Sequence, residues 1–348
     1  TAAPAAHAHA VFPHPQGKAF VDFDEDLTIG DLRTAVREGF DSVELMKRYS
    51  TIGMGPSQGK LSNVNGIRIL AELTGRDIGA VGATTPRPFV HPVPMVALAG
   101  RRLRRSWRTP LDPWHRAHGA LMHEAGTWLR PRCYGAGPRA AAIAREHAAV
   151  RGQVGLIDVS TLGKIELFGR DAQALLEYAY PCSFARLVTG MTRYVFMTDG
   201  GGTLIDDGVC ARLGDDHFYL TTTSGQAQNV VRLLELYAAE LALDVAIVER
   251  SFALGAFNLA GPAARAVLAA VSDVDLAAAA FPYLACRAGH VAGVPARVMR
   301  VGFVGETGYE IHLPASRTAG AWEALMAAGE AHGITPFGVD AQRLLRLE

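Results

Sequence analysis

Cysteine is scarce in this chain, which has only four among its 348 residues. They are Cys133, Cys182, Cys210 and Cys286, and no two are close enough in sequence to form a Cys-x-x-Cys pair. A disulfide framework and a zinc knuckle both need cysteines that are more numerous or more closely spaced. The composition therefore fits a reducing compartment, and we expect a cytoplasmic protein.

An excess of charge of one sign is also lacking, as is a long apolar run. Lys plus Arg and Asp plus Glu both number 34, so the composition favours neither nucleic acid nor an anionic membrane as a partner. No apolar run reaches the ~20 residues that span a bilayer. The first ten residues lack the basic and apolar segments of a signal peptide and an initiator Met. We expect the chain to begin inside a longer polypeptide.

Two cofactor patterns are absent as well. The glycine-rich stretch at residues 53–59 does not follow a predicted strand, so it is not a dinucleotide-binding fingerprint. His115, His118 and His123 are close in sequence, but no pattern of carboxylates completes a metal site with them. The sequence therefore predicts neither a nucleotide-binding Rossmann domain nor a metal centre in these 348 residues.

Hydrophobic residues make up 49% of the chain, which is enough for two or three globular domains. We divide the sequence into a flexible arm (residues 1–17), a small helical domain (18–82), a linker rich in Pro, Arg and Trp (83–140) and an α+β domain (141–348). In the helical domain, Thr28 followed by Asp31 resembles a capping box and predicts the start of a helix.

The α+β domain shows a weak internal repeat. Residues 164–180 and 256–271 share one plan, in which a strand is followed by a glycine turn and a helix. This plan predicts two related α+β lobes. Between the two copies, a glycine turn leads into a strand that carries Asp206 and Asp207. Because side chains alternate along a strand, one carboxylate is expected to point into a cleft while the other faces away, toward solvent.

Several motifs of residues 141–348 occur together in an order that resembles the glycine-cleavage aminomethyltransferase (T-protein) family. They are residues 158–164, the Asp pair at 206–207, and residues 259–262, 302–311 and 343–348. The resemblance implies an aminomethyltransferase-like fold that binds tetrahydrofolate.

The resemblance also implies roles for individual residues. Asp207 matches the catalytic carboxylate beside the folate nitrogen that takes up the one-carbon unit, and a carboxylate there can accept the proton of an attacking amine. Glu310 matches the glutamate that binds the pterin, whose two adjacent donors one carboxylate can accept. Leu162 and Tyr194 match positions beside the folate. The alternatives are an ordinary turn aspartate, a strand-edge glutamate and a core tyrosine.

Two positions that would contact folate depart from the family pattern. Phe303 stands where the family has a tyrosine, and Gln342 stands where it has an arginine. The first loses a hydroxyl group, and the second loses a cation that would lie near the glutamate tail of folate. An oxidase-type folate site need not keep either.

The N-terminal half resembles the alpha subunit of heterotetrameric sarcosine oxidase. The matching segments are residues 20–23, 37–44, 47–49, 53–55, 58–60 and 128–131. The small helical domain is similar to domains that hold a [2Fe–2S] cluster, but residues 1–132 contain no cysteine to ligate one. The family's C-terminal barrel is missing and would follow residue 348, so we expect an interior piece of a longer alpha chain.

The resemblance implies a function in folate-dependent one-carbon capture. Sarcosine is oxidised in a flavin-bearing beta subunit, and this chain transfers the methyl-derived carbon to tetrahydrofolate to give 5,10-methylenetetrahydrofolate. Flavin and NAD are expected only in the complete complex, on parts absent here. Two alternatives remain: a glycine-cleavage aminomethyltransferase, and a non-catalytic folate-binding or scaffold fragment.

Overall fold

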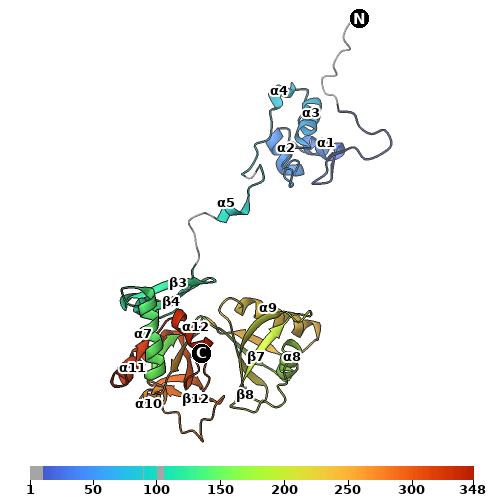
Figure 1. Ribbon diagram of the computed structural model, residues 1–348. Coiled ribbons are helices and arrows are strands. Elements are labelled where there is room, and N and C mark those ends of the chain that lie inside the picture. The colour runs from blue at the N-terminus through green and yellow to red at the C-terminus, as the bar shows by residue number, and fades with distance from the viewer. Residues whose placement is uncertain (1–10, 89, 100–105) are drawn as a thin grey trace. The chain divides into compact units, whose positions relative to one another are not determined.

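The computed structural model describes residues 11–88, 90–99 and 106–348. Most of the predicted flexible arm, residues 1–10, lies outside the described residues. The chain divides into two compact units, Thr1–Arg104 and Arg105–Glu348 (Figure 1). No helix among the described residues is long and apolar enough to cross a bilayer.

The first unit is a small helical domain. Its elements are β1 (Phe20–Asp22), β2 (Leu27–Thr28), α1 (Ile29–Arg37), α2 (Val43–Ser50), α3 (Asn63–Thr74), α4 (Ile78–Val81) and α5 (Met95–Ala99). At the start of α1, Asp31 accepts a hydrogen bond from the backbone N–H of Thr28 at 2.8 Å, as the capping pattern predicts. Leu32, Met46 and Leu70, from three different helices, are buried together in the core of this unit.

The second unit contains two lobes, each built on one antiparallel or mostly antiparallel sheet. The first lobe has a five-stranded sheet in the order β10-β6-β9-β8-β7, and the second has a six-stranded sheet in the order β12-β13-β14-β11-β5-β15. The strands of the first sheet are β6 (Gly163–Phe168), β7 (Thr192–Thr198), β8 (Leu204–Gly214), β9 (His217–Thr222) and β10 (Ala246–Glu249). Those of the second are β5 (Gly155–Asp158), β11 (Leu254–Ala260), β12 (Cys286–Val291), β13 (Val294–Met299), β14 (Gly308–Pro314) and β15 (Thr335–Pro336).

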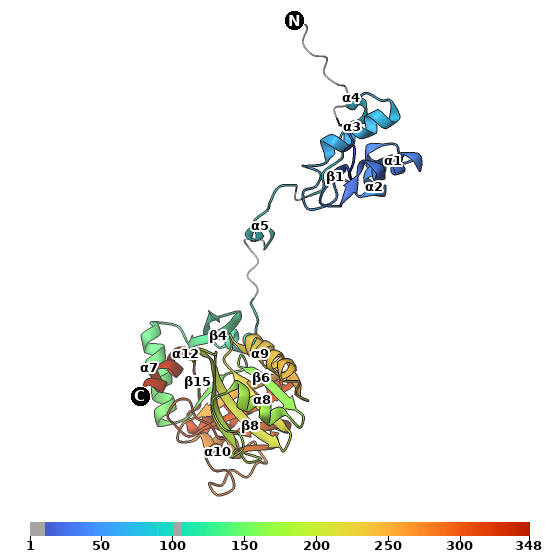
Figure 2. The same cartoon turned by 90° about the vertical axis from the view of Figure 1, so that its right-hand side faces the viewer.

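Six helices pack against the two sheets. They are α7 (Arg139–Gly152), α8 (Ala172–Ala179), α9 (Ala227–Glu240), α10 (Ala264–Ala269), α11 (Thr318–Gly329) and α12 (Val339–Leu347). In the second lobe, α10 and α11 cover one face of the sheet while α7 and α12 pack on the other. Short 3₁₀ turns at Ala315–Arg317 and Glu330–His332 flank α11. Figure 2 shows α8 and α9 on the outer face of the five-stranded sheet, where they enclose an apolar core.

The predicted internal repeat is present in the structure. Each lobe runs strand, helix, hairpin, strand, helix: β6-α8-β7-β8-β9-α9 in the first and β11-α10-β12-β13-β14-α11 in the second. Both copies turn from strand to helix at a glycine with nearly the same backbone angle, φ 132° at Gly169 and 133° at Gly261. A Cβ atom would lie 2.4 Å from a backbone oxygen at the first position and 2.6 Å at the second. Both turns therefore need glycine.

The region assigned to a linker contains more structure than the sequence predicts. It holds α6 (Asp112–Ala117) and a hairpin of β3 (Ala120–Ala125) and β4 (Trp128–Tyr134). The backbone oxygen of Arg132, in β4, lies so close to Gly338 at the start of α12 that a Cβ atom on this glycine would be 2.2 Å from it. Pro131 and a shift of register after Leu121 blur the alternation of these strands, which is why the pattern reads as irregular.

Candidate functional site

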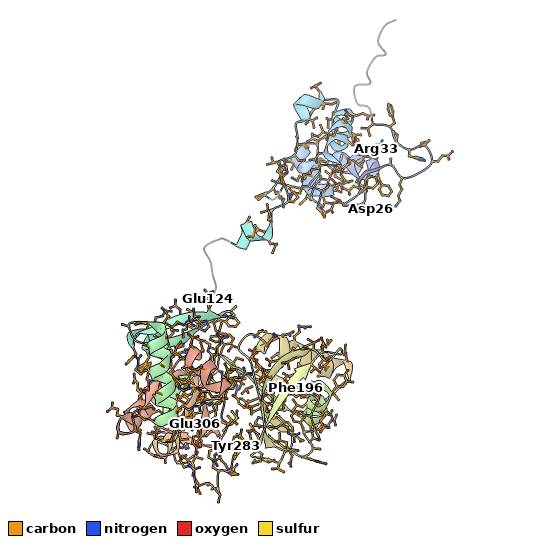
Figure 3. The ribbon with its side chains drawn as sticks, viewed as in Figure 1. Asp26, Arg33, Glu124, Phe196, Tyr283 and Glu306 are labelled. Atoms are coloured by element: carbon orange, nitrogen blue, oxygen red, sulfur yellow. The ribbon has the colours of Figure 1, made fainter. Side chains whose placement is uncertain are left out.

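A cavity of about 620 Å³ lies between the two lobes of the second unit. All six site residues expected from the sequence line it: Leu162, Tyr194, Asp207, Phe303, Glu310 and Gln342. They come from β7, β8, β14, α12 and two loops. Tyr283, labelled in Figure 3 between the lobes, lines the same cavity. The structure therefore brings together residues that are up to 180 positions apart.

Asp207 lies on β8 and faces the cavity. Tyr194, on the neighbouring strand β7, donates a hydrogen bond from its hydroxyl to Asp207 Oδ2 at 2.9 Å. Burial and the neighbouring Asp207 carboxylate raise the pKa of Tyr194, so its hydroxyl stays protonated and acts as a donor. One oxygen of Asp207 is thus held in place by a protein donor.

Asp206 faces away from the cavity, but it does not meet solvent. Its carboxylate is buried, and Oδ1 accepts hydrogen bonds from the backbone N–H and the hydroxyl of Thr223 at 3.1 and 2.5 Å. The expectation of a solvent-facing partner was wrong because both faces of this sheet are covered, one by α8 and α9 and the other by the second lobe. Burial raises the pKa of Asp206 to about 6.

Gly208 follows Asp207 and lets β8 approach β9 closely. A Cβ atom at this position would lie 1.8 Å from the backbone oxygen of Thr221, so no other residue fits without a shift of the strand. Next to it, the backbone N–H of Val209 donates to the hydroxyl of Thr221 at 3.0 Å. This close approach fixes the part of β8 that carries Asp207.

Glu310, on β14, is held by a chain of two buried side chains. Glu310 Oε1 lies 2.7 Å from His312 Nε2, and His312 Nδ1 lies 2.7 Å from the Tyr219 hydroxyl on β9 of the other lobe. Burial lowers the pKa of His312, which favours a neutral ring that accepts from Tyr219 and donates to Glu310. Arg297 stacks on the Tyr219 ring with its Cζ atom 4.0 Å from the ring centre. The glutamate is therefore fixed to both lobes.

The guanidinium of Arg346 lies near Phe303 and Gln342, the two positions that depart from the family pattern. Arg346 follows Gln342 by one turn of α12, and both line the cavity. The Arg346 Cζ atom lies 5.3 Å from the centre of the Phe303 ring, within the range of a cation–π contact. The sequence analysis did not single out Arg346 as a site residue.

Leu162 belongs to a turn whose backbone oxygens accept hydrogen bonds from a buried lysine. Lys164 Nζ donates hydrogen bonds to the backbone oxygens of Ser160 and Leu162, both at 2.8 Å. Burial lowers the pKa of Lys164 to about 8, although Asp158 and Glu310 oppose the shift. The apolar side chain of Leu162 is thereby presented to the cavity.

Sequence reasoning missed several other residues of the cavity wall. They include Arg130, Thr222, Thr223, Asn258 and Tyr283. Arg130 and Asn258 each have a buried polar atom with no hydrogen-bond partner among the described residues. A polar Asn between Phe257 and Leu259 in an otherwise apolar strand was the one signal in the sequence that marks Asn258.

The described residues contain no cluster of His, Cys, Asp or Glu that could hold a metal ion. His115 is instead a buried structural residue, with Nε2 3.0 Å from Asp158 and Nδ1 2.9 Å from the Tyr134 hydroxyl. All four cysteines are free. The cavity is therefore equipped for an organic ligand, with a fixed acceptor at Glu310 and a second acceptor at Asp207 that can bind or remove an amine proton.

Comparison with known proteins agrees with this geometry. The model of the GCVT N-terminal domain family matches residues 111–348, and that of the sarcosine oxidase A3 domain matches residues 16–101. The crystal structure of glycine cleavage system aminomethyltransferase T from Bartonella henselae superimposes with a TM-score of 0.61 and 27% identity, covering 69% of this chain and 62% of that one. The expected aminomethyltransferase-like fold is confirmed.

Similar sequences extend the match to the first unit. Sarcosine oxidase subunit alpha from Rhizobium meliloti is 40% identical over 97% of this chain, and the one from Corynebacterium sp. (strain U-96) is 38% identical over 94%. The chain spans about a third of the length of these relatives, 35% in each case. An aminomethyltransferase from Streptomyces coelicolor is 35% identical over 69% of this chain and 62% of its own length. The chain belongs to the GCVT N-terminal domain family and is homologous over nearly its whole length to sarcosine oxidase alpha subunits.

Proposed function

We propose that this chain is the one-carbon capture part of a sarcosine oxidase alpha subunit and binds tetrahydrofolate in the cavity between its two lobes. The observation that carries the proposal is the convergence of Asp207 and Glu310 on one cavity of about 620 Å³. That volume lies within the range of small-molecule and cofactor sites. Glu310 would accept the two donors of the pterin edge, and Asp207 would face the reacting nitrogen.

The proposed reaction starts from the imine that forms when sarcosine loses two electrons to a flavin elsewhere in the oxidase. A folate nitrogen attacks the methylene carbon of this imine, and a second folate nitrogen then displaces glycine, which gives 5,10-methylenetetrahydrofolate. The two protons lost by the folate nitrogens end on the glycine amine. Asp207 accepts the first proton and returns it to the leaving amine, while Tyr194 holds the carboxylate in position.

The partners and the location in this proposal rest on the resemblance to sarcosine oxidase alpha subunits. A flavin-bearing beta subunit and smaller subunits would supply the imine, and the NAD- and flavin-binding parts would lie outside these 348 residues. Four free cysteines support a reducing, cytoplasmic setting.

A glycine-cleavage aminomethyltransferase is the second candidate, because the GCVT model matches residues 111–348. The match of the sarcosine oxidase A3 model to residues 16–101 favours the oxidase. The source of the carbon separates the two functions. An aminomethyltransferase would release ammonia from an aminomethyl carrier protein, whereas the oxidase part would release glycine from the sarcosine-derived imine.

Calorimetry with the stable reduced folate 5-formyltetrahydrofolate tests the proposal. We expect the chain to bind this ligand and the Glu310→Gln variant to bind about 1–3 kcal/mol more weakly, the range of a hydrogen bond to a charged group. Glu323→Gln, at an exposed position of α11 outside the cavity, is the matched control and should bind as the parent does. Absence of binding by the parent chain, or equal affinity in Glu310→Gln, contradicts the proposal.

A further inference from the structure

His312 follows Glu310 by two positions on β14 and lies behind it, outside the cavity. Side chains two apart on a strand share one face, whereas Ile311 between them packs in the core on the opposite face. His312 is only 2% exposed, and it does not line the cavity. Its link to the cavity is the contact of its Nε2 atom with Glu310 Oε1 at 2.7 Å.

The two contacts of the imidazole indicate which nitrogen carries the proton. Nε2 faces a carboxylate, which has only acceptors when ionised, so Nε2 has to donate. Nδ1 lies 2.7 Å from the hydroxyl of Tyr219, whose pKa is raised by burial, so this hydroxyl keeps its proton and can donate to Nδ1. Burial and the charges of Lys164 and Arg297 lower the pKa of His312, while Glu310 opposes the shift. A neutral ring that is protonated at Nε2 therefore satisfies both partners.

Glu310 depends on His312 for its orientation. Among the described residues, the hydrogen bond from His312 is the only one that the Glu310 side chain makes. A carboxylate offers about four lone-pair positions, and His312 uses one of those on Oε1, so both oxygens can still accept from a ligand. A side chain that is ordered only when the ligand arrives lowers the affinity, whereas one that is already held does not.

The second contact of the imidazole links Glu310 to the first lobe. Tyr219, on β9, is fully buried in an apolar cluster that combines residues of both sheets. Arg297, on β13, lies over the Tyr219 ring and also pairs with Glu166 of β6 at 3.2 Å. These contacts hold the Tyr219 hydroxyl where it meets His312. The orientation of Glu310 is therefore set by residues of both lobes.

We propose that His312 is a positioning residue that donates a hydrogen bond from Nε2 to Glu310 Oε1 and so prepares this carboxylate for the ligand, while the Tyr219 hydroxyl orients the imidazole. The inference rests on the proposed function and adds to it a residue that does not touch the ligand. Hydrogen bonds to an ionised acceptor are stronger than those between neutral groups. A side chain that places a donor at the position of Nε2 should therefore support binding, and one that lacks such a donor should not.

Glutamine and asparagine form a matched pair of substitutions at this position. The amide nitrogen of Gln reaches about as far as Nε2 of histidine, whereas that of Asn reaches only as far as Nδ1. Calorimetry of the whole chain with 5-formyltetrahydrofolate measures the effect. We expect His312→Gln to bind with an affinity within about threefold of that of the parent. His312→Asn and His312→Leu should bind about tenfold or more weakly, the effect of one lost hydrogen bond to a charged group.

Nitrogen NMR of the ligand-free chain, with isotope-labelled histidine rings, tests the tautomer without any folate. The signals of His312 are those that disappear in His312→Gln. We expect a protonated Nε2 and a bare Nδ1 at neutral pH. A bare Nε2 overturns the proposal, because no donor would then face Glu310. Tyr219→Phe removes the hydrogen bond to Nδ1, so it should shift the Nδ1 signal and weaken folate binding by about threefold. An unchanged signal and affinity in Tyr219→Phe overturn the role of Tyr219.

Ile311→Val is the control for general damage to β14. Ile311 is fully buried in the core on the opposite face of the strand, so this variant should lower the melting temperature and leave the affinity for 5-formyltetrahydrofolate unchanged. Melting curves of all variants show which of them fold, and the comparison of Gln with Asn decides the matter if the Leu variant does not.

Three outcomes separate the inference from the proposed function. If the parent binds and the Asn and Leu variants bind within about twofold of it, or the Gln variant binds as weakly as these two, the role of His312 is overturned and the folate site stands. Absence of binding by the parent overturns both. Weaker binding in His312→Asn and His312→Leu, but not in His312→Gln or Ile311→Val, supports the inference.

Discussion

Asp206 and Asp207 follow one another on β8 but lie in different surroundings. Asp207 reaches the cavity and is bound by the Tyr194 hydroxyl, whereas Asp206 is buried on the helix-covered side and bound by Thr223. The difference arises from strand alternation in a sheet that is covered on both faces. One carboxylate is therefore open to a ligand, and the other fixes the backbone next to it.

Asp207→Asn tests the catalytic part of the proposal in the complete oxidase. We expect sarcosine oxidation to stay nearly unchanged and formation of methylenetetrahydrofolate to fall about 10²–10⁴-fold, the usual contribution of a positioned general base. Imine that is not captured would hydrolyse, so formaldehyde should accumulate. Both products are measured with sarcosine and tetrahydrofolate present. An unchanged ratio of the products in Asp207→Asn would show that this carboxylate takes no part.

Asp206 should make folding stability depend on pH. Its pKa rises from 3.8 to about 6 on folding, so the folded state holds the proton more tightly. The stabilisation is fully present below about pH 4 and is lost as the pH rises through 6. Asp206→Asn removes this loss and keeps an oxygen for Thr223. Between pH 4 and 7.5, the unfolding free energy of the variant relative to the parent should therefore rise by up to about 3 kcal/mol.

Urea unfolding at the two pH values measures this change. Asp244→Asn, at an exposed aspartate outside the cavity, is the control and should show no comparable rise. Equal pH dependence in the parent and in Asp206→Asn would mean that Asp206 is not the group responsible.

The residues that carry chemistry were more predictable from the sequence than those that complete the wall. Asp207 and Glu310 stand inside motifs with a fixed order, and the structure places both at one cavity, although their roles stay predictions. Asn258 stands in no such motif, and Arg130 lies in a matching segment, residues 128–131, to which the resemblance assigned no role. Both residues reach the cavity wall through strand pairing and tertiary packing, which only the folded chain reveals.

At the scale of elements, one guanidinium joins two segments of the cavity wall. Arg151, near the end of α7, donates to the backbone oxygen of Val304 at 2.6 Å and to that of Leu345 in α12 at 2.9 Å. It also pairs with Glu306, labelled in Figure 3, at 3.0 Å. Phe303 precedes Val304, and Arg346 follows Leu345, so this contact fixes the separation of two cavity-lining side chains.

Arg151→Met should loosen both segments. We expect a loss of stability of about 1–2 kcal/mol from the unpaired carbonyl groups and a several-fold weaker affinity for 5-formyltetrahydrofolate. Melting curves and calorimetry measure the two effects. Arg170→Met is the matched control, since the ion pair of Arg170 with Asp244 is largely exposed and contributes little. If affinity is unchanged in Arg151→Met while stability falls, the two segments keep their positions without the contacts of Arg151.

The elements of the second unit were predicted best where apolar and polar residues follow a regular pattern along the sequence. The sequence predicts a strand and a helix within residues 164–180, and the structure has β6 at Gly163–Phe168 and α8 at Ala172–Ala179. The hairpin of β3 and β4 was not predicted, because a proline and a register shift interrupt its pattern. Its pairing also depends on α7 and α12, which follow it in the chain, and local propensity carries no information about such contacts.

At the scale of the whole molecule, the division into two units coincides with the division found by comparison. The A3 model matches residues 16–101 and the GCVT model matches residues 111–348, while the structure separates Thr1–Arg104 from Arg105–Glu348. Each unit has its own buried core. Every residue that lines the large cavity belongs to the second unit.

This division predicts that the second unit binds its ligand alone. A fragment of residues 105–348 should unfold in one cooperative transition and bind 5-formyltetrahydrofolate with an affinity within about threefold of that of the whole chain. The reason is that the acceptors at Asp207 and Glu310 and the contacts of Arg151 all lie inside this fragment. Calorimetry of the fragment and of the whole chain gives both quantities. Glu310→Gln in the fragment should weaken binding by the same factor as in the whole chain. An affinity more than tenfold lower in a folded fragment would show that the first unit contributes to the site.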